Sequence, residues 1–392
     1  MMDAVTATDP MHPFQLSEAQ RAIAEMARDF ADRSIAPHAL DWDERRHFPL
    51  DVIRATAPLG MGGIYVRESS GGSGLSRLDA ALIFEALATG CPAIAAYISI
   101  HNMVAWMIDR YGNDQQRARF LPDLVSMATL ASYCLTEPGC GSDAAALTCR
   151  ARRDGGDYVL DGTKQFISGA GATDLYLVMA RTGGTGPGGV SCFVVERDVA
   201  GLSFGSNERK MGWNAQPTRQ VVFDGIRIPA SHRLGAEGEG FRIAMSGLDG
   251  GRLNIGACSL GGAQKALEAT LAYTKQRTAF GKPLDAFQAL QFRLADMATT
   301  LESARVMLWY AAAALDRSAP DATRLCAMAK RIATDTGFDV ANQALQLHGG
   351  YGYLADYGIE KIVRDLRVHQ ILEGTNEIMR MIVARSLIGR ET

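Results

Sequence analysis

One carboxylate near the C-terminal end of the chain is placed where it could act as a base. Glu373 follows two apolar residues and precedes Gly374, so it is expected to leave an apolar segment on a tight turn. A carboxylate beside apolar surface holds its proton more tightly than usual, which suits proton abstraction near neutral pH. Thr375 or Asn376 can cap the next helix, because a short side-chain oxygen accepts a hydrogen bond from a free N–H. On local sequence alone, a loop glutamate that stabilises a helix N-terminus is the simpler interpretation.

A second segment with chemical potential is the glycine-rich stretch 133–143. A β-rich run ends at Pro138, and Gly139, Gly141 and Ser142 follow it. Such a loop can present backbone N–H groups and a hydroxyl to an anionic or carbonyl-bearing ligand. On spacing alone, an ordinary surface loop is the favoured interpretation.

Three matches to common motifs are interpreted as chance. Residues 139–144 and 350–355 fit G-x-G-x-x-A, but neither lies in a strand–loop–helix unit followed by an acidic residue about 20 positions later. Residues 201–205 fit the G-x-S-x-G pattern of serine hydrolases, but no amphipathic helix follows. A chain with 41 glycines is expected to contain such matches.

The pattern of elements divides the chain into three blocks. Helical periodicity dominates residues 1–130, short β-rich runs occupy residues 131–240, and helical periodicity returns in residues 241–392. Helices, strands and helices in separate blocks predict three segregated domains instead of a doubly wound sheet. The predicted fold is therefore mainly α-helical with a central β domain.

Three local patterns make this fold more specific. In residues 290–315, apolar side chains recur at alternating steps of four and three, which is typical of a helix packed in a bundle. A second long helix is expected over residues 322–347, closed by a glycine C-cap. The dipeptide Asp161-Gly162 lies between two β-rich runs and predicts a hairpin turn.

Composition narrows the class of protein. Of the 392 residues, 47% are hydrophobic and 21% charged, as in soluble globular proteins, and the formal charge of −3 argues against a nucleic-acid partner. Seven scattered cysteines without a C-x-x-C pair indicate a reducing compartment and no metal site. No apolar run approaches the roughly 18 residues of a membrane span. The first 20 residues lack a targeting pattern, so a cytoplasmic protein is expected.

Five segments, in their order and spacing, resemble the acyl-CoA dehydrogenase family. They are residues 133–143, 166–171, 277–281, 346–353 and 371–380. The resemblance spans nearly the whole chain. It implies an FAD enzyme with an N-terminal helical domain, a middle β-barrel and a C-terminal four-helix bundle, assembled as a homotetramer. It also implies that electrons pass to electron-transferring flavoprotein.

The resemblance assigns a role to each matching residue. Glu373 would be the base that removes the α-proton of an acyl thioester while the β-hydrogen leaves as hydride to the flavin. The flavin would be bound by Tyr133, Leu135, Thr136, Gly141, Ser142, Phe166, Ile167, Ser168, Thr375 and Glu377. The dinucleotide portion of FAD would be bound from a neighbouring subunit by Arg277, Phe280, Phe287, Gln288, Gln346, Leu347, Gly349 and Gly350. The substrate would lie along Ser142, Asp249, Gly250, Gly251, Arg252 and Arg385.

Two positions differ among members of the family. Some relatives carry the base near residues 249–252, where this chain has Gly250 and Gly251; this supports Glu373 as the sole base, with Asp249 as a minor alternative. Many relatives have tryptophan where this chain has Phe166. Phe166 would still cover a flavin face, but it lacks the indole N–H.

Residues 99–103, 212–219, 250–255 and 371–377 most resemble the members that oxidise isobutyryl-CoA to methacrylyl-CoA in valine catabolism. A methyl group more or less in an apolar pocket changes specificity by only about 1–3 kcal/mol. The alternatives 2-methylbutyryl-CoA and butyryl-CoA therefore stay open. An acyl-CoA oxidase, and a non-catalytic flavoprotein of this fold that binds nucleic acid, are the remaining possibilities.

Overall fold

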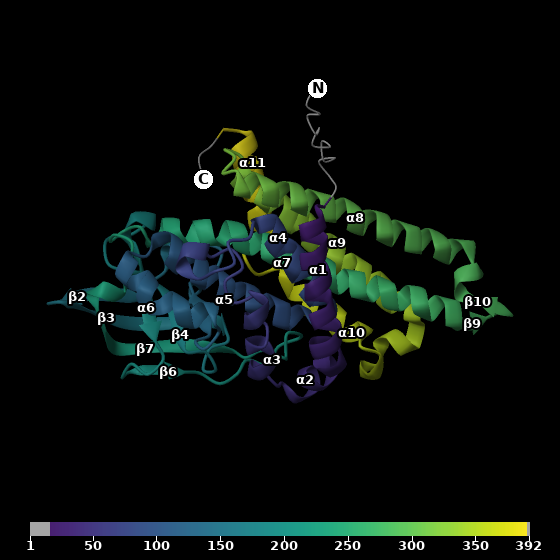
Figure 1. Ribbon diagram of the computed structural model, residues 1–392, viewed down its shortest axis with the longest axis horizontal. Helices are drawn as coiled ribbons and strands as arrows, with labels where there is room; N and C mark the ends of the chain where they lie inside the picture. The colour runs from purple at the N-terminus through teal and green to yellow at the C-terminus, as the bar shows by residue number, and fades with distance from the viewer. Residues whose placement is uncertain (1–15, 390–392) are drawn as a thin grey trace, which may run out of the picture.

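The computed structural model describes residues 16–389 (Figure 1). The first 20 residues, for which no targeting pattern was predicted, therefore lie mostly outside the described residues. The first part of the chain is helical, as predicted. Its helices are α1 (Glu18–Phe30), α2 (Ala39–Arg45), α3 (Leu50–Arg54), α4 (Arg77–Gly90), α5 (Pro92–Tyr111) and α6 (Asp114–Val125). Helix α1 is capped by Ser17, whose hydroxyl accepts a hydrogen bond from the Gln20 N–H in a capping box.

The middle part is a sheet of eight strands. These are β1 (Ala131–Cys134), β2 (Arg150–Asp154), β3 (Asp157–Ser168), β4 (Leu175–Arg181), β5 (Val190–Glu196), β6 (Leu202–Phe204), β7 (Thr218–Pro229) and β8 (Arg233–Leu234). Their order is β6-β7-β3-β2-β4-β5-β8, and β1 pairs in parallel with β4. Strands β4 and β5 are buried on both faces, which explains their nearly continuous apolar sequence. Leu177 and Met179 pack towards α5, whereas Tyr176 and Val178 pack towards β3 and β7.

The predicted hairpin at Asp161-Gly162 is wrong. Strand β3 runs straight through this dipeptide and pairs with β7 across a bulge between Leu160 and Gly162. Gly162 has φ 144°, and a Cβ there would lie 2.8 Å from the Cys149 Cα, so the glycine serves a bulge and a close backbone approach. The actual turn between β2 and β3 lies at residues 155–156.

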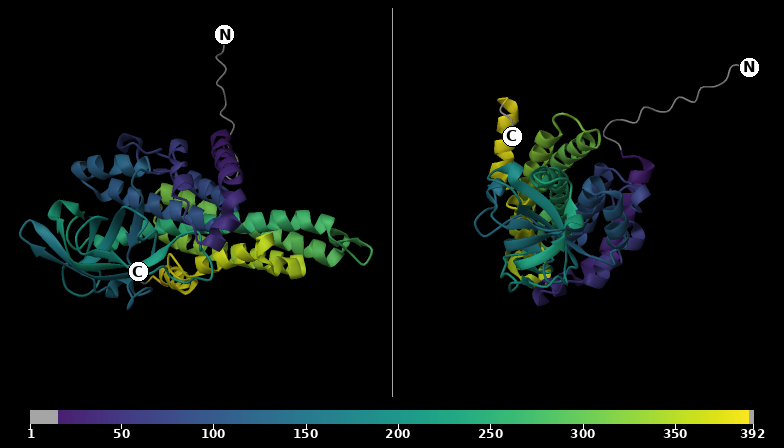
Figure 2. Two further views of the ribbon diagram at one scale, coloured as in Figure 1. Left: turned by 90° about the horizontal axis from the view of Figure 1, so that it is seen from below. Right: turned by 90° about the vertical axis from the view of Figure 1, so that its left-hand side faces the viewer.

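The last part is again helical. Its helices are α7 (Gly240–Gln276), α8 (Gln288–Asp316), α9 (Ala322–His348), α10 (Ile359–Arg367) and α11 (Asn376–Leu387). Figures 1 and 2 show the sheet at one end of the molecule and the long helices α7, α8 and α9 reaching the other end, where a two-stranded ribbon of β9 (Thr278–Ala279) and β10 (Lys282–Pro283) joins α7 to α8.

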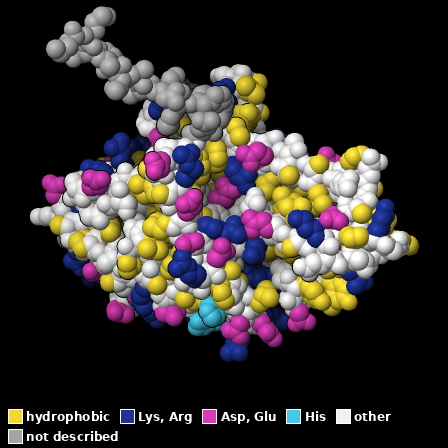
Figure 3. All heavy atoms as spheres, turned by 45° about the vertical axis from the view of Figure 1, so that its right-hand side comes forward, with side chains coloured by type: hydrophobic (Ala, Val, Ile, Leu, Met, Phe, Trp, Pro, Cys, Tyr) yellow, Lys and Arg dark blue, Asp and Glu magenta, His cyan; other side chains and the backbone are white. Residues whose placement is uncertain are grey.

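Both long helices expected from the sequence are present. In α8 the buried residues Met297, Leu301, Ala304, Leu308 and Ala311 follow the predicted apolar repeat. Helix α9 ends at His348 and is capped by Gly349, whose φ of 59° lies in the left-handed region that favours glycine. Across residues 16–389, each helix is either too short or too polar to cross a membrane. Figure 3 shows charged side chains of both signs interspersed with apolar patches on one face.

Candidate active site

Glu373 lies on a left-handed turn between the 3-10 turn Val368–Gln370 and α11. Its φ is 56° and that of Gly374 is 87°. For Glu373 this conformation costs about 1 kcal/mol or more, so the surrounding structure must impose it. A Cβ on Gly374 would lie 2.7 Å from the Met379 Cε. Of the two possible caps for the next helix, Thr375 is the N-cap, because its hydroxyl accepts a hydrogen bond from the Ile378 N–H at 3.3 Å.

The Glu373 carboxylate is isolated from hydrogen-bond donors. Its Oε2 atom is buried and has no hydrogen-bond partner among the described residues, although Glu373 as a whole is only half-buried. Burial raises the pKa of Glu373 to about 7, while the positive charges of Arg252 and Lys330 act to lower it. A carboxyl group with a pKa near neutrality and a free oxygen has the properties of a general base.

Helix α7 approaches this carboxylate at a residue without a side chain. A Cβ on Gly251 would lie 2.4 Å from Glu373 Oε2 and 3.2 Å from Met103 Sδ. Gly251 therefore makes room for the Glu373 carboxylate, whereas a Cβ on Gly250 would lie 2.4 Å from Arg77 Nη1. Arg252 is buried next in sequence, and its charge reaches Glu373.

Asp249 is committed to other contacts. Its Oδ1 accepts a hydrogen bond from Arg252 Nη1 at 2.6 Å, and its Oδ2 accepts one from the Thr323 hydroxyl at 2.6 Å. Burial raises the pKa of Asp249, and the positive charge of Arg252 opposes that rise. With both oxygens engaged, Asp249 is much less suited than Glu373 to take a proton from a ligand. Arg385 lies exposed on α11, and among the described residues it forms no ion pair with Asp249.

The glycine-rich loop after β1 is held by a buried ion pair that the sequence patterns did not reveal. Lys164 Nζ lies 2.8 Å from Glu137 Oε1 and donates a second hydrogen bond to the Leu135 carbonyl at 3.0 Å. Glu137 also accepts hydrogen bonds from the N–H groups of Thr148 and Cys149. Burial alone would raise the pKa of Glu137, but Lys164 and these donors hold it below its usual value.

Several residues predicted to contact the flavin are arranged as an open platform beside this loop. Phe166 is 62% exposed and has a left-handed φ of 59°, an arrangement that leaves a large aromatic face uncovered. The buried Tyr133 hydroxyl has no hydrogen-bond partner among the described residues, and the charge of Glu373 reaches it. A Cβ on Gly139 or Gly141 would meet open space. An aromatic cover, a free hydroxyl and an open glycine loop fit a flat ring with polar edges, which is the isoalloxazine of FAD.

The remaining predicted contacts of this group occupy the same region. Leu135, Thr136 and Ser142 follow β1, whereas Ile167 and Ser168 end β3. The two segments are joined by a hydrogen bond from the Gln165 N–H to the Thr136 carbonyl at 2.8 Å. Glu377 is exposed on the first turn of α11.

A pocket of about 620 Å³ lies at the far end of the bundle. Among its lining residues are five that were predicted to bind the dinucleotide portion of FAD: Arg277, Gln346, Leu347, Gly349 and Gly350. Tyr273 and Arg293 also line it and were not predicted. Neither arginine forms an ion pair within residues 16–389, so both guanidinium groups are available to an anion such as a pyrophosphate.

The other predicted dinucleotide contacts lie beside this pocket. Phe280 is 95% exposed and packs edge-on against Phe287 with ring centroids 6.2 Å apart, and Gln288 begins α8. Gln346 is sixteen positions beyond Lys330 on α9, or roughly 24 Å at the rise of an α-helix. A different pocket, of about 1060 Å³, lies over α3 and α6 and is lined by none of the predicted site residues.

Comparison with known proteins identifies the family. Residues 17–128, 132–226 and 238–388 match the models of the acyl-CoA dehydrogenase N-terminal, middle and C-terminal domains. The mitochondrial isobutyryl-CoA dehydrogenase of Bos taurus is 55% identical over 373 residues, which cover 95% of this chain and 90% of that protein.

Two solved structures share the fold. One, described as the electron transferring flavoprotein of Acidaminococcus fermentans, has a TM-score of 0.94 and 37% identity, and covers 96% of this chain and 100% of its own. The other is the FADH2 complex of a glutaryl-CoA dehydrogenase from Mycobacterium smegmatis, with a TM-score of 0.90, 29% identity and 96% coverage of both chains. The predicted three-part fold and the FAD cofactor are confirmed. The chain therefore belongs to the acyl-CoA dehydrogenase family of FAD-dependent oxidoreductases.

Proposed function

We propose that Glu373 is the base that removes the α-proton of a short branched-chain acyl-CoA, with isobutyryl-CoA as the preferred substrate. The observation that carries the proposal is the buried, unpartnered Oε2 atom of Glu373 in the space left by Gly251. The 55% identity to bovine isobutyryl-CoA dehydrogenase supports the choice of acyl group. The product is then methacrylyl-CoA, and the reaction belongs to valine catabolism.

The residues around Glu373 explain how a carboxylate can take so weakly acidic a proton. Burial raises the proton affinity of Glu373, which brings it closer to that of the thioester α-carbon. The positive charges of Arg252 and Lys330 oppose that rise and so favour the ionised form that accepts the proton. A bound thioester would displace water from the turn and raise the proton affinity further.

FAD, when bound, supplies the acceptor for the β-hydrogen, which leaves as hydride. The residues of this chain contribute by placing the flavin ring and the thioester relative to each other. Phe166 would cover one ring face, the hydroxyls of Tyr133, Thr136 and Ser168 would border the ring, and Ser142 would face the thioester. The predicted residues of α11, Thr375 and Glu377, complete this side of the site. The base and the cofactor must lie on opposite sides of the bond that becomes unsaturated.

The position of the 620 Å³ pocket, which we call the dinucleotide pocket, supports assembly as a homotetramer. Arg277 and the turn at residues 349–350 lie at the end of the bundle, roughly 24 Å along α9 from the Glu373 turn, so we infer that they serve the flavin of a neighbouring subunit. Exposed aromatic residues surround this end, with Phe280 95% and Tyr353 80% exposed, as expected of a surface that meets another subunit.

Electron-transferring flavoprotein is the proposed electron acceptor. The similar solved structure from Acidaminococcus fermentans, which is described as an electron transferring flavoprotein, supports this proposal. The cytoplasmic location stays a prediction, because the bovine relative is mitochondrial.

Anaerobic titration with acyl-CoA thioesters tests the proposed substrate. The purified yellow protein is mixed with isobutyryl-, 2-methylbutyryl-, butyryl- or isovaleryl-CoA while bleaching of the flavin band is followed. We expect isobutyryl-CoA to bleach the flavin fastest. Faster bleaching by another thioester would overturn the substrate but keep the reaction, and no bleaching by any of them would overturn both.

A further inference from the structure

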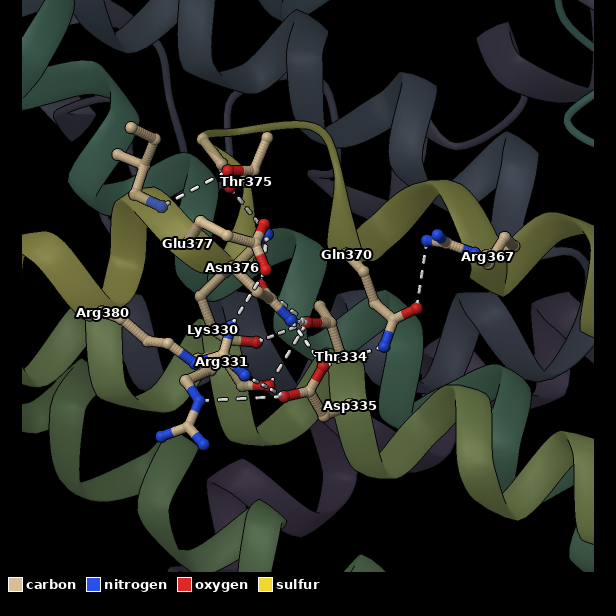
Figure 4. A network of polar contacts seen from close by, with 12 residues as sticks. Lys330, Arg331, Thr334, Asp335, Arg367, Gln370, Thr375, Asn376, Glu377 and Arg380 are labelled. Carbon is tan, nitrogen blue, oxygen red and sulfur yellow. Dashed lines mark hydrogen bonds and ion pairs between the residues drawn. The ribbon is translucent and has the colours of Figure 1, made fainter. Parts of the chain in front are cut away.

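Helix α9 contacts the turn that carries Glu373 through a buried ammonium group. Lys330 is 0% exposed, and its Nζ donates hydrogen bonds to the Gly374 carbonyl and to Asn376 Oδ1, both at 2.8 Å (Figure 4). Lysine is rarely buried completely unless its donors are satisfied, so these two bonds explain its place. One of them is made to the backbone of the residue directly after the proposed base.

A second residue of α9 fixes both ends of the same turn. Asp335 Oδ1 accepts hydrogen bonds from Gln370 Nε2 at 2.8 Å, before the turn, and from Asn376 Nδ2 at 2.7 Å, after it. Asn376 Nδ2 also donates to the Thr334 hydroxyl at 3.0 Å. Figure 4 shows these side chains converging on α9 from the segments on either side of the turn. The carboxylate therefore sits on a short loop that is clamped at both ends.

The turn needs such a clamp. Glu373 and Gly374 are both left-handed, and this conformation is unfavourable for a glutamate unless its surroundings impose it. The Gly374 carbonyl belongs to the peptide group that directly follows this left-handed pair, so the hydrogen bond from Lys330 fixes the end of the turn to α9.

The same ammonium also acts on the carboxylate through its charge. Arg252 on α7 and Lys330 on α9 both lower the pKa of Glu373, whereas burial raises it. Tyr65 and Tyr133 also face this carboxylate, and Asp335, Glu377 and His369 face Lys330. Burial lowers the pKa of Lys330 to about 8, and the negative charges of Glu373 and Asp335 oppose that fall.

We propose that Lys330 is a positioning residue for Glu373, which anchors the left-handed turn to α9 and places the carboxylate against Gly251. The inference rests on the proposed role of Glu373 as the base. Lys330 itself does not exchange a proton with the substrate; it fixes where the carboxylate lies and keeps it ionised.

Two variants separate the hydrogen bond from the charge. Lys330→Met removes both, whereas Lys330→Gln removes the charge but keeps an N–H donor. We expect Lys330→Met to lower kcat by about tenfold or more, because a small displacement of a catalytic group has a large effect on rate. Lys330→Gln is expected to recover part of this loss. In both variants the acid limb of the kcat/KM profile shifts to higher pH, since a positive charge that favoured the ionised base is gone.

Arg331→Met is the matched control. It removes one positive charge from the adjacent position of α9, where the side chain is 49% exposed and forms only a loose pair with Asp335 at 3.8 Å. Its kcat and acid limb are expected to match those of the wild-type protein. The pKa of Glu373 is also read without turnover, from the pH dependence of its infrared carboxyl stretch relative to the same protein carrying Glu373→Gln.

The outcomes distinguish this inference from the proposed function. Substantial turnover in Glu373→Gln would refute Glu373 as the base. If Glu373→Gln is inactive while Lys330→Met behaves like Arg331→Met in rate and in pH profile, the positioning role of Lys330 is refuted and the base assignment stands. If Lys330→Met does not retain FAD, Lys330→Gln decides the question: an unshifted carboxyl pKa in that variant contradicts the inference.

Discussion

The Glu373 carboxylate occupies the space that a side chain at Gly251 would fill. A Cβ on Gly251 would lie only 2.4 Å from Glu373 Oε2, closer than nonbonded atoms approach. The two residues are 122 positions apart in the sequence, and their roles depend on each other: Gly251 leaves a space on α7, and the Glu373 carboxylate fills it. The glycine admits the carboxylate to a buried site on α7, and burial in turn raises the pKa of Glu373 to about 7.

Gly251→Ala should therefore lower activity without unfolding the protein. The clashing atom is the end of a flexible side chain, so the carboxylate can move while the helix stays in place. Alanine also favours the helix by about 1 kcal/mol relative to glycine. We expect kcat to fall by about tenfold or more, with unchanged FAD content and a melting temperature that is equal or higher. The control is Gly188→Ala, where a Cβ meets open space and the rate should not change.

Much of the architecture could be predicted because it depends on patterns of residues that are close together in the sequence. The apolar repeat of α8 and the glycine end of α9 depend on neighbouring residues only. The hairpin at Asp161-Gly162 failed because a glycine preceded by aspartate signals a turn and a bulge equally well. Only the pairing of β3 with β7 decides between them.

The residues that support the site could not be predicted in the same way. Lys164 and Glu137 are 27 positions apart, and Lys330 is 44 from Gly374, so tertiary packing alone brings these groups together. In the sequence, a buried lysine looks like a surface lysine. The resemblance to a family predicted Glu373 as the base and the loop after β1 as a flavin contact, but it did not indicate which buried charges hold these two segments.

Replacing the base should abolish the reaction and leave the cofactor bound. Glu373→Gln keeps the size of the side chain and removes its ability to take a proton. The variant should be yellow and should bind acyl-CoA, but anaerobic mixing with isobutyryl-CoA should not bleach its flavin. A variant of Asp249 cannot serve as the neutral control, because Asp249 pairs with Arg252 beside the site. Bleaching at a substantial fraction of the wild-type rate would rule out Glu373 as the base.

The raised pKa of Glu373 also predicts a pH dependence of stability. The folded state holds this proton more tightly, since the pKa is about 7 against the usual value of 4.5. The stabilisation from the protonated group is complete below pH 4.5 and is lost as the pH rises through 7. Wild type should therefore become less stable relative to Glu373→Gln on going from pH 5 to pH 8, by up to about 3 kcal/mol. Urea unfolding of both proteins measures this difference, and parallel curves would contradict it.

Breaking the buried ion pair of Lys164 and Glu137, which holds the glycine-rich loop after β1, should lower the free energy of unfolding far more than breaking an exposed pair. Lys164→Met leaves the Glu137 carboxylate buried without its cation, a change that destabilises proteins by about 3–5 kcal/mol. Because Lys164 also donates to the Leu135 carbonyl, the variant should release FAD at lower denaturant concentration than it unfolds. Arg227→Met is the control: its pair with Asp154 is about half exposed, and its loss should leave the stability nearly unchanged.

The dinucleotide pocket gives a test that separates cofactor binding from catalysis. Arg277 lies exposed at the end of α7 and lines the pocket, so Arg277→Met should weaken FAD binding by removing a cation from the pyrophosphate. The Kd of FAD, measured by reconstituting the apoprotein, is expected to rise by about tenfold or more. Once saturated with FAD, the variant should bleach with isobutyryl-CoA at a rate close to wild type, because Glu373 is untouched. Lys275→Met removes an exposed charge two positions away and should leave the Kd unchanged. Equal Kd values for all three proteins would contradict the assignment of this pocket to FAD.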